Sequence, residues 1–112
     1  MAEQVRLQDS KKKFQAAFKH AVSQKEEAEK QYNDDKEVGI TNDNFIVWSA
    51  LNAPAYSAAR NEYSAARASY EQALQQADNK GFKDWQEKVK QAARDNAGPN
   101  GPDYDTLVGP DE

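Results

Sequence analysis

Residues 56–76 read YSAARNE, YSAARAS and YEQALQQ, which is one pattern of seven residues written three times. The first and fourth positions of successive repeats are spaced by three and then four residues, so they fall on one side of an α-helix. Rings alternate with methyl groups along this Tyr/Ala stripe, which consists of Tyr56, Ala59, Tyr63, Ala66, Tyr70 and Ala73. Alanine lets a second helix approach closely, and tyrosine supplies contact area with a polar tip. The repeat therefore predicts a long helix that packs against another helix along this stripe.

The rest of the chain is also predicted to be helical. Apolar spacing, together with the positions of glycine and proline, predicts helices over about 3–37, 43–52, 54–79 and 83–96. Gly39 followed by Ile40 is typical of a helix end, because glycine readily adopts the left-handed cap conformation. Pro54 fits the first turn of the third helix. Gly81 is expected to end that helix.

Helix lengths suggest how these elements are arranged. The first helix should span roughly 52 Å at ~1.5 Å per residue, and the second and third helices together cover about the same distance. This match predicts an antiparallel helical hairpin with the fourth helix along its side. We therefore expect an all-α domain over residues 1–98, a three-helix bundle plus one short helix. Trp48 and Trp85 are expected inside it.

The last residues have a different composition. Gly98-Pro99-Asn100-Gly101-Pro102 stops regular structure, and the residues after it carry no Lys or Arg. The acidic side chains of this region are Asp103, Asp105, Asp111 and Glu112. Residues 99–112 are therefore predicted to be a flexible, disordered acidic tail, unless Tyr104, Leu107 and Val108 dock on the helices.

Composition excludes several classes of partner. The chain has 112 residues and a net charge of −4, and all of that charge lies in the tail, so the body offers no basic patch for nucleic acid and no basic face for a membrane. The start of the chain holds no apolar signal segment, which favours a cytoplasmic protein. Leu, Ile, Val and Phe together number only 16. Such a thin core would gain stability from a protein partner or a second copy.

Catalytic and metal-binding parts are scarce. The chain has no cysteine and one histidine, His20, so the sequence gives no basis for arguing a Ser-His-Asp or a Cys-His arrangement. Ala17 stands three residues before His20, which leaves no Glu-x-x-His unit for a carboxylate metal site. We expect an exposed histidine, with a general base or a ligand as the alternative. No catalytic residue, metal or cofactor is predicted, and the chain is not expected to be an enzyme.

The function that fits this pattern is a non-enzymatic helical protein–protein interaction module, such as an adaptor, inhibitor or small assembly subunit. The Tyr/Ala stripe either packs inside the bundle or lies partly on the surface as an adhesive face for a partner or a second copy. Under the second interpretation Arg60 and Arg67 are its rim, because tyrosine and arginine dominate interface hot spots.

Two alternatives stay open. One is a carrier of small hydrophobic ligands, with a pocket lined by Phe45, Trp48, Trp85 and the tyrosines. The other comes from Trp48-Ser49-Ala50 near mid-chain, which resembles the central tryptophan turn of the small ESX-type secreted proteins. Those proteins are of similar length, but Ala50 stands where that family has glycine, and the connection is longer than a tight hairpin needs. The resemblance implies a secreted helical hairpin.

Overall fold

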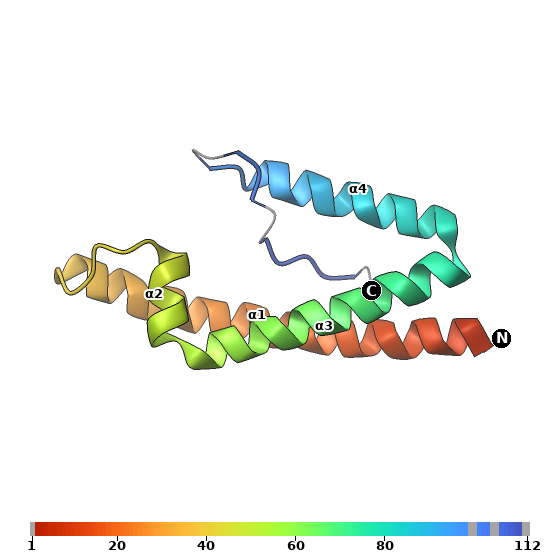
Figure 1. Cartoon of the computed structure of the whole chain (residues 1–112), viewed down its shortest axis with the longest axis horizontal. Helices are drawn as coiled ribbons and strands as arrows, with labels where there is room; N and C mark the ends of the chain where they lie inside the picture. The colour runs from red at the N-terminus through yellow and green to blue at the C-terminus, as the bar shows by residue number, and fades with distance from the viewer. Residues whose placement is uncertain (1, 99–100, 104–105, 111–112) are drawn as a thin grey trace.

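The computed structural model describes residues 2–98, 101–103 and 106–110, and most of them lie in four α-helices (Figure 1). The helices are α1 (Ala2–Glu37), α2 (Phe45–Asn52), α3 (Pro54–Ala77) and α4 (Asn79–Asp95). The prediction of an all-α protein is confirmed for these residues. Tyr104, Asp105, Asp111 and Glu112, which belong to the predicted tail, lie outside the described residues.

The predicted end of α1 is confirmed in detail. Gly39 has a φ of +81°, in the left-handed region that favours glycine. The amide of Ile40 donates to the carbonyl of Asp35 at 2.8 Å, and the amide of Gly39 donates to that of Lys36 at 3.2 Å. This pair of bonds is a Schellman motif, which satisfies carbonyls that the end of a helix leaves free.

The boundary between α2 and α3 follows from local chemistry. The side chain of Asn44 caps α2 by accepting a hydrogen bond from the amide of Val47 at 2.9 Å, so the helix begins two residues later than predicted. Ala53 breaks the helical path with a φ of −127°, and Pro54 opens α3 as expected.

The predicted boundary between α3 and α4 is wrong. The break lies at Asp78, where the backbone leaves the helical conformation (φ −153°, ψ 87°) and the carboxylate accepts a hydrogen bond from the amide of Gly81 at 2.9 Å. Gly81 therefore belongs to the first turn of α4. Its role is spatial, because a Cβ at this position would lie 2.5 Å from Oδ2 of Asp78.

The helices form an elongated molecule of 56 × 27 × 19 Å. Figure 1 shows α1 and α3 side by side and running in opposite directions. The short helix α2 lies at the end where α1 finishes. After α3 the chain turns back, and α4 covers only the half of the pair that holds the amino end of α1.

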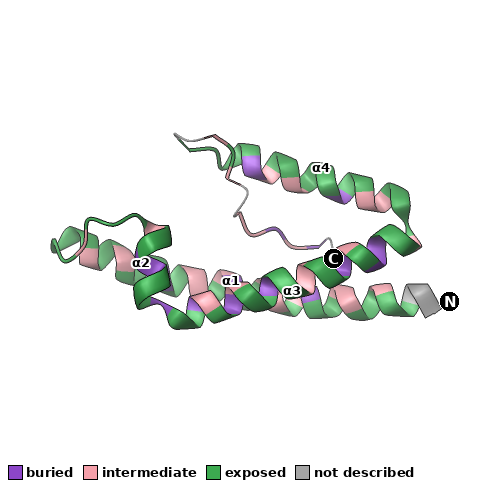
Figure 2. Ribbon diagram, viewed as in Figure 1, coloured by how far each residue is buried: buried purple, intermediate pink, exposed green. Residues whose placement is uncertain are grey.

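The core consists of two clusters along the α1/α3 pair (Figure 2). The larger cluster surrounds Phe14, which is fully buried, and the rings of Tyr63, Tyr70 and Trp85 lie 5.2–5.6 Å from it. The smaller cluster is built on Trp48. Its buried members are Ala28, Trp48, Ala53 and Tyr56, with Tyr32 and Phe45 packed against them.

Part of the predicted flexible tail is packed in this structure. Val108 is buried in the larger cluster, and Leu107 packs against that cluster. Leu107 and Val108 therefore dock on the helices, which is the alternative to a flexible tail. Tyr104, the third residue named for this docking, lies outside the described residues.

Candidate functional site

The Tyr/Ala stripe faces the interior. Tyr56, Tyr63 and Tyr70 are at most 7% exposed, Ala59 and Ala73 are buried, and Ala66 is half-buried. Ala21 of α1 and Ala59 of α3 are both buried in the larger cluster, so each helix contributes a methyl group to it. The rings thus belong to the contact between the helices, and the structure does not offer them to a partner.

The two arginines of the predicted rim are both half-buried. Nε of Arg67 donates to Oε1 of Glu71 at 3.2 Å, and Oε2 of the same carboxylate accepts from Nε1 of Trp85 at 3.2 Å. Arg67 therefore helps to fix the indole of α4 against α3. Arg60 lines a hollow of about 280 Å³ together with Lys25 and Asp103.

The predicted aromatic pocket does not form as a unit. Phe45 and Trp48 belong to the smaller cluster, whereas Trp85 belongs to the larger one. Both tryptophans are buried, as expected. Trp48 lies within α2, with its Nε1 donating to Oδ2 of Asp35 at 3.0 Å. It does not form a turn between two long helices, unlike the tryptophan of the ESX-type pattern.

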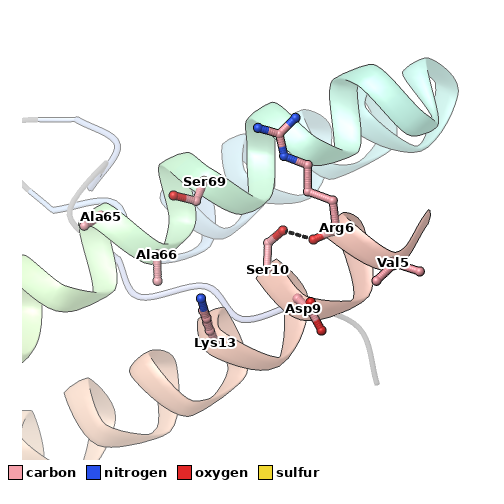
Figure 3. A pocket seen from close by; sticks show the side chains of 8 residues that line it. All are labelled: Val5, Arg6, Asp9, Ser10, Lys13, Ala65, Ala66 and Ser69. Carbon is pink, nitrogen blue, oxygen red and sulfur yellow. Dashed lines mark hydrogen bonds between the residues drawn. The ribbon is translucent and has the colours of Figure 1, made fainter. Parts of the chain in front are cut away.

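A groove of about 710 Å³ lies between the first turns of α1 and the middle of α3 (Figure 3). Its floor is made of small residues of α3, and its rim carries Arg6, Asp9 and Lys13 of α1. The hydroxyl of Ser10 donates to the carbonyl of Arg6 in its own helix, which is a helical back-bond and not a nucleophile–base pair. The side chain of Arg6 donates to Gln76 at 3.2 Å. The lining of the groove thus combines charged side chains at its rim with apolar side chains of both helices, and the contacts described for its lining residues include no nucleophile–base pair.

The chemical groups that catalysis would need are dispersed. His20 is exposed on α1, where it lines a shallow hollow together with Lys13 and Glu62. Across the described residues, no three His, Cys, Asp or Glu side chains gather at metal-binding distance. None of the helices described here has the length and the apolar content needed to cross a bilayer.

The surface that sequence reasoning missed is the outer side of α2. We define the α2 face as Ile46, Val47, Ala50 and Leu51, which occupy adjacent positions at i, i+1, i+4 and i+5. Ile46 is 61% exposed, Val47 44% and Leu51 73%. The helix contains no charged residue. An uncharged, apolar helix face that points away from the core is therefore present at one end of the molecule.

The α2 face rests on a firmly held helix. On its inner side the ring of Trp48 lies 5.5 Å from that of Tyr32, and the ring of Phe45 lies 5.7 Å from that of Tyr56. The side-chain amide of Asn52 donates to the carbonyl of Trp48 at 3.0 Å. The signal in the sequence is the run FIVWSAL itself, because an eight-residue helix against one hairpin can bury only one of its sides.

No protein-family model matches the chain, and neither a curated protein nor a solved structure shows significant similarity to it.

Proposed function

We propose that the chain is a non-enzymatic protein–protein interaction module that binds its partner through the α2 face. The observation that carries this proposal is the exposure of Ile46, Val47 and Leu51 on one side of a helix that has no charged residue. Isolated apolar residues are normal on protein surfaces, but a contiguous group on one helix face is typical of a binding site.

The anchoring of α2 supports the same proposal. Because its inner side is fixed by Trp48, Phe45 and the Asn44 cap, the outer side is presented in one conformation. A preorganised surface loses less conformational entropy on binding, so more of the apolar contact appears as affinity.

The charges near α2 indicate the chemistry of the partner. Residues 34–52 contain one basic and four acidic side chains, and Lys25, Arg60 and Asp103 line a hollow with Ile46 and Ala50 of the α2 face. Together these groups are three basic and five acidic side chains, so the surroundings of α2 are acidic overall. Two copies that met through this surface would bring like charges together, which is unfavourable. We therefore propose a different protein, with apolar anchors for the α2 face and Lys or Arg side chains at the rim.

The test compares two aspartate substitutions of equal charge on equally exposed residues. Leu51 and Val38 are 73% and 69% exposed, but only Leu51 belongs to the α2 face. Burial of a leucine contributes about 1.5–3 kcal/mol, so Leu51→Asp should weaken binding by tenfold or more. A partner captured from the native source by the wild type and by Val38→Asp, but not by Leu51→Asp, supports the proposal.

The same experiment can overturn it. A partner that Leu51→Asp retains would place the binding surface elsewhere. A reversible dimer seen by sedimentation, abolished by Leu51→Asp, would replace the basic partner with a second copy. With a purified partner, affinity should fall as salt rises, because rim charges are screened at about 10 Å in 0.1 M salt.

The alternatives have less support. The hypothesis of a hydrophobic-ligand carrier needs one pocket lined by Phe45, Trp48 and Trp85. Trp85 lies in a different cluster from Phe45 and Trp48, so this pocket has no support. The secreted helical hairpin stays a prediction that rests on the resemblance at Trp48-Ser49-Ala50.

A further inference from the structure

A second surface, separate from the α2 face, is already occupied by the chain itself. Residues 106–110, which we call the docked segment, lie between α4 and the α1/α3 pair (Figure 1). We call the space that they fill the tail groove. Its walls come from Phe18 of α1, Tyr63 of α3 and Lys88 of α4. Val108 is 6% exposed there.

The tail groove holds the backbone of the docked segment. The hydroxyl of Tyr63 accepts a hydrogen bond from the amide of Val108 at 2.9 Å and donates one to the carbonyl of the same residue at 3.0 Å. Nζ of Lys88 donates to the carbonyl of Gly109 at 3.1 Å. Bonds to the peptide backbone supply affinity whatever the side chains are, as in the recognition of extended peptides at sheet edges.

Side chains of the docked segment are selected at three consecutive positions. Val108 belongs to the larger cluster, which also contains Phe14 and Trp85, and this apolar surrounding favours an aliphatic residue. The following residue is glycine, and a Cβ at Gly109 would lie only 2.6 Å from Cδ2 of Phe18, so any larger residue would force this ring or the segment to move. Pro110, the next residue, is buried as well. The groove therefore fits a Val-Gly-Pro sequence.

The docked segment is joined to α4 by a short connection. Ten residues, 96–105, separate Asp95 from Thr106. A connection of this length gives the attached segment an effective concentration on the order of millimolar. An external peptide must compete with the docked segment for the groove. Its apparent affinity is the intrinsic affinity multiplied by the fraction of molecules whose groove is open.

We propose that the tail groove is a peptide-recognition site, and that residues 106–110 are its built-in occupant. The external ligand is an extended segment of a partner protein that carries an aliphatic residue followed by Gly-Pro. When this partner segment binds, it replaces the docked segment and takes over the two backbone bonds of Tyr63.

The test opens the groove without changing its walls. Gly109→Val places a branched side chain against Phe18 and should expel the docked segment from the full-length chain. Gly98→Val is the matched control, because a Cβ on Gly98 would meet no atom within 4 Å. The probe is a fluorescent peptide of residues 103–112, with its binding measured by anisotropy.

The expected result is that Gly109→Val binds the peptide at least about tenfold more tightly than the wild type or Gly98→Val. The same peptide with Val in place of Gly109 should not bind any of the three proteins. The substitution Leu51→Asp should leave peptide binding unchanged, which separates this site from the α2 face.

Two results would overturn the proposal. If Gly109→Val keeps its helical circular dichroism but does not bind the peptide, the docked segment is only a structural part of the fold. If the wild type forms a concentration-dependent dimer that Gly109→Val abolishes, the segment is exchanged between two copies and the ligand is not a different protein.

Discussion

Replacement of Phe14 by alanine should cost more stability than almost any other single change. Its ring is fully buried, and it contacts the rings of Tyr63, Tyr70 and Trp85 at centroid distances of 5.6, 5.2 and 5.6 Å. Removal of a buried phenylalanine ring costs about 3–5 kcal/mol of stability in comparable cores, because apolar burial is lost and a cavity is left behind. A domain of this size is stable by about 5–15 kcal/mol in total. Phe14→Ala should therefore remove a large part of the free energy of unfolding.

The free energy of unfolding is measured by urea denaturation, followed by circular dichroism and extrapolated linearly to water. Leu51→Ala is the control, since a largely exposed leucine should change stability by no more than about 0.5 kcal/mol. In a Trp48→Phe background, the fluorescence of Trp85 reports on the larger cluster alone. A loss below about 1 kcal/mol for Phe14→Ala would refute the packing described for this cluster.

Three further substitutions test local features. Tyr63→Phe leaves the amide and carbonyl of Val108 without their partner, which should cost about 1–3 kcal/mol and speed hydrogen exchange at that amide, as seen by NMR. Asp78→Ala removes the cap of α4 and should cost about 0.5–2 kcal/mol in thermal denaturation, whereas Asp78→Asn should change little. Gly39→Ala forces a side chain into a left-handed conformation and should cost about 1 kcal/mol by urea denaturation. An unchanged midpoint in any of the three would contradict the corresponding contact.

The long helices could be predicted because their signals are local and repeated. The Tyr/Ala stripe sets one side of α3 at regular spacing, and Gly39 marks the end of α1 by its backbone conformation. The break between α3 and α4 could not be assigned in the same way. Asp78 and Gly81 both carry helix-boundary signals, and the choice depends on which of the two residues leaves the helical conformation.

The two candidate sites depend on contacts between distant residues. The apolar run of α2 predicts burial, but which side is covered follows from where Tyr32 and Tyr56 lie. In the tail, glycine and proline correctly exclude a helix for residues 106–110, yet they do not show that Tyr63 bonds a residue 45 positions away. Sequence periodicity carries no information about such pairs.

The division of the core into two clusters has a consequence for any assembly that contains this chain. The α2 face rests on the smaller cluster, and the tail groove opens into the larger one. The two sites are nevertheless neighbours, because Ile46 and Ala50 of the α2 face line one hollow with Asp103, three residues before the docked segment. Release of that segment should therefore change the affinity of the α2 face for its partner.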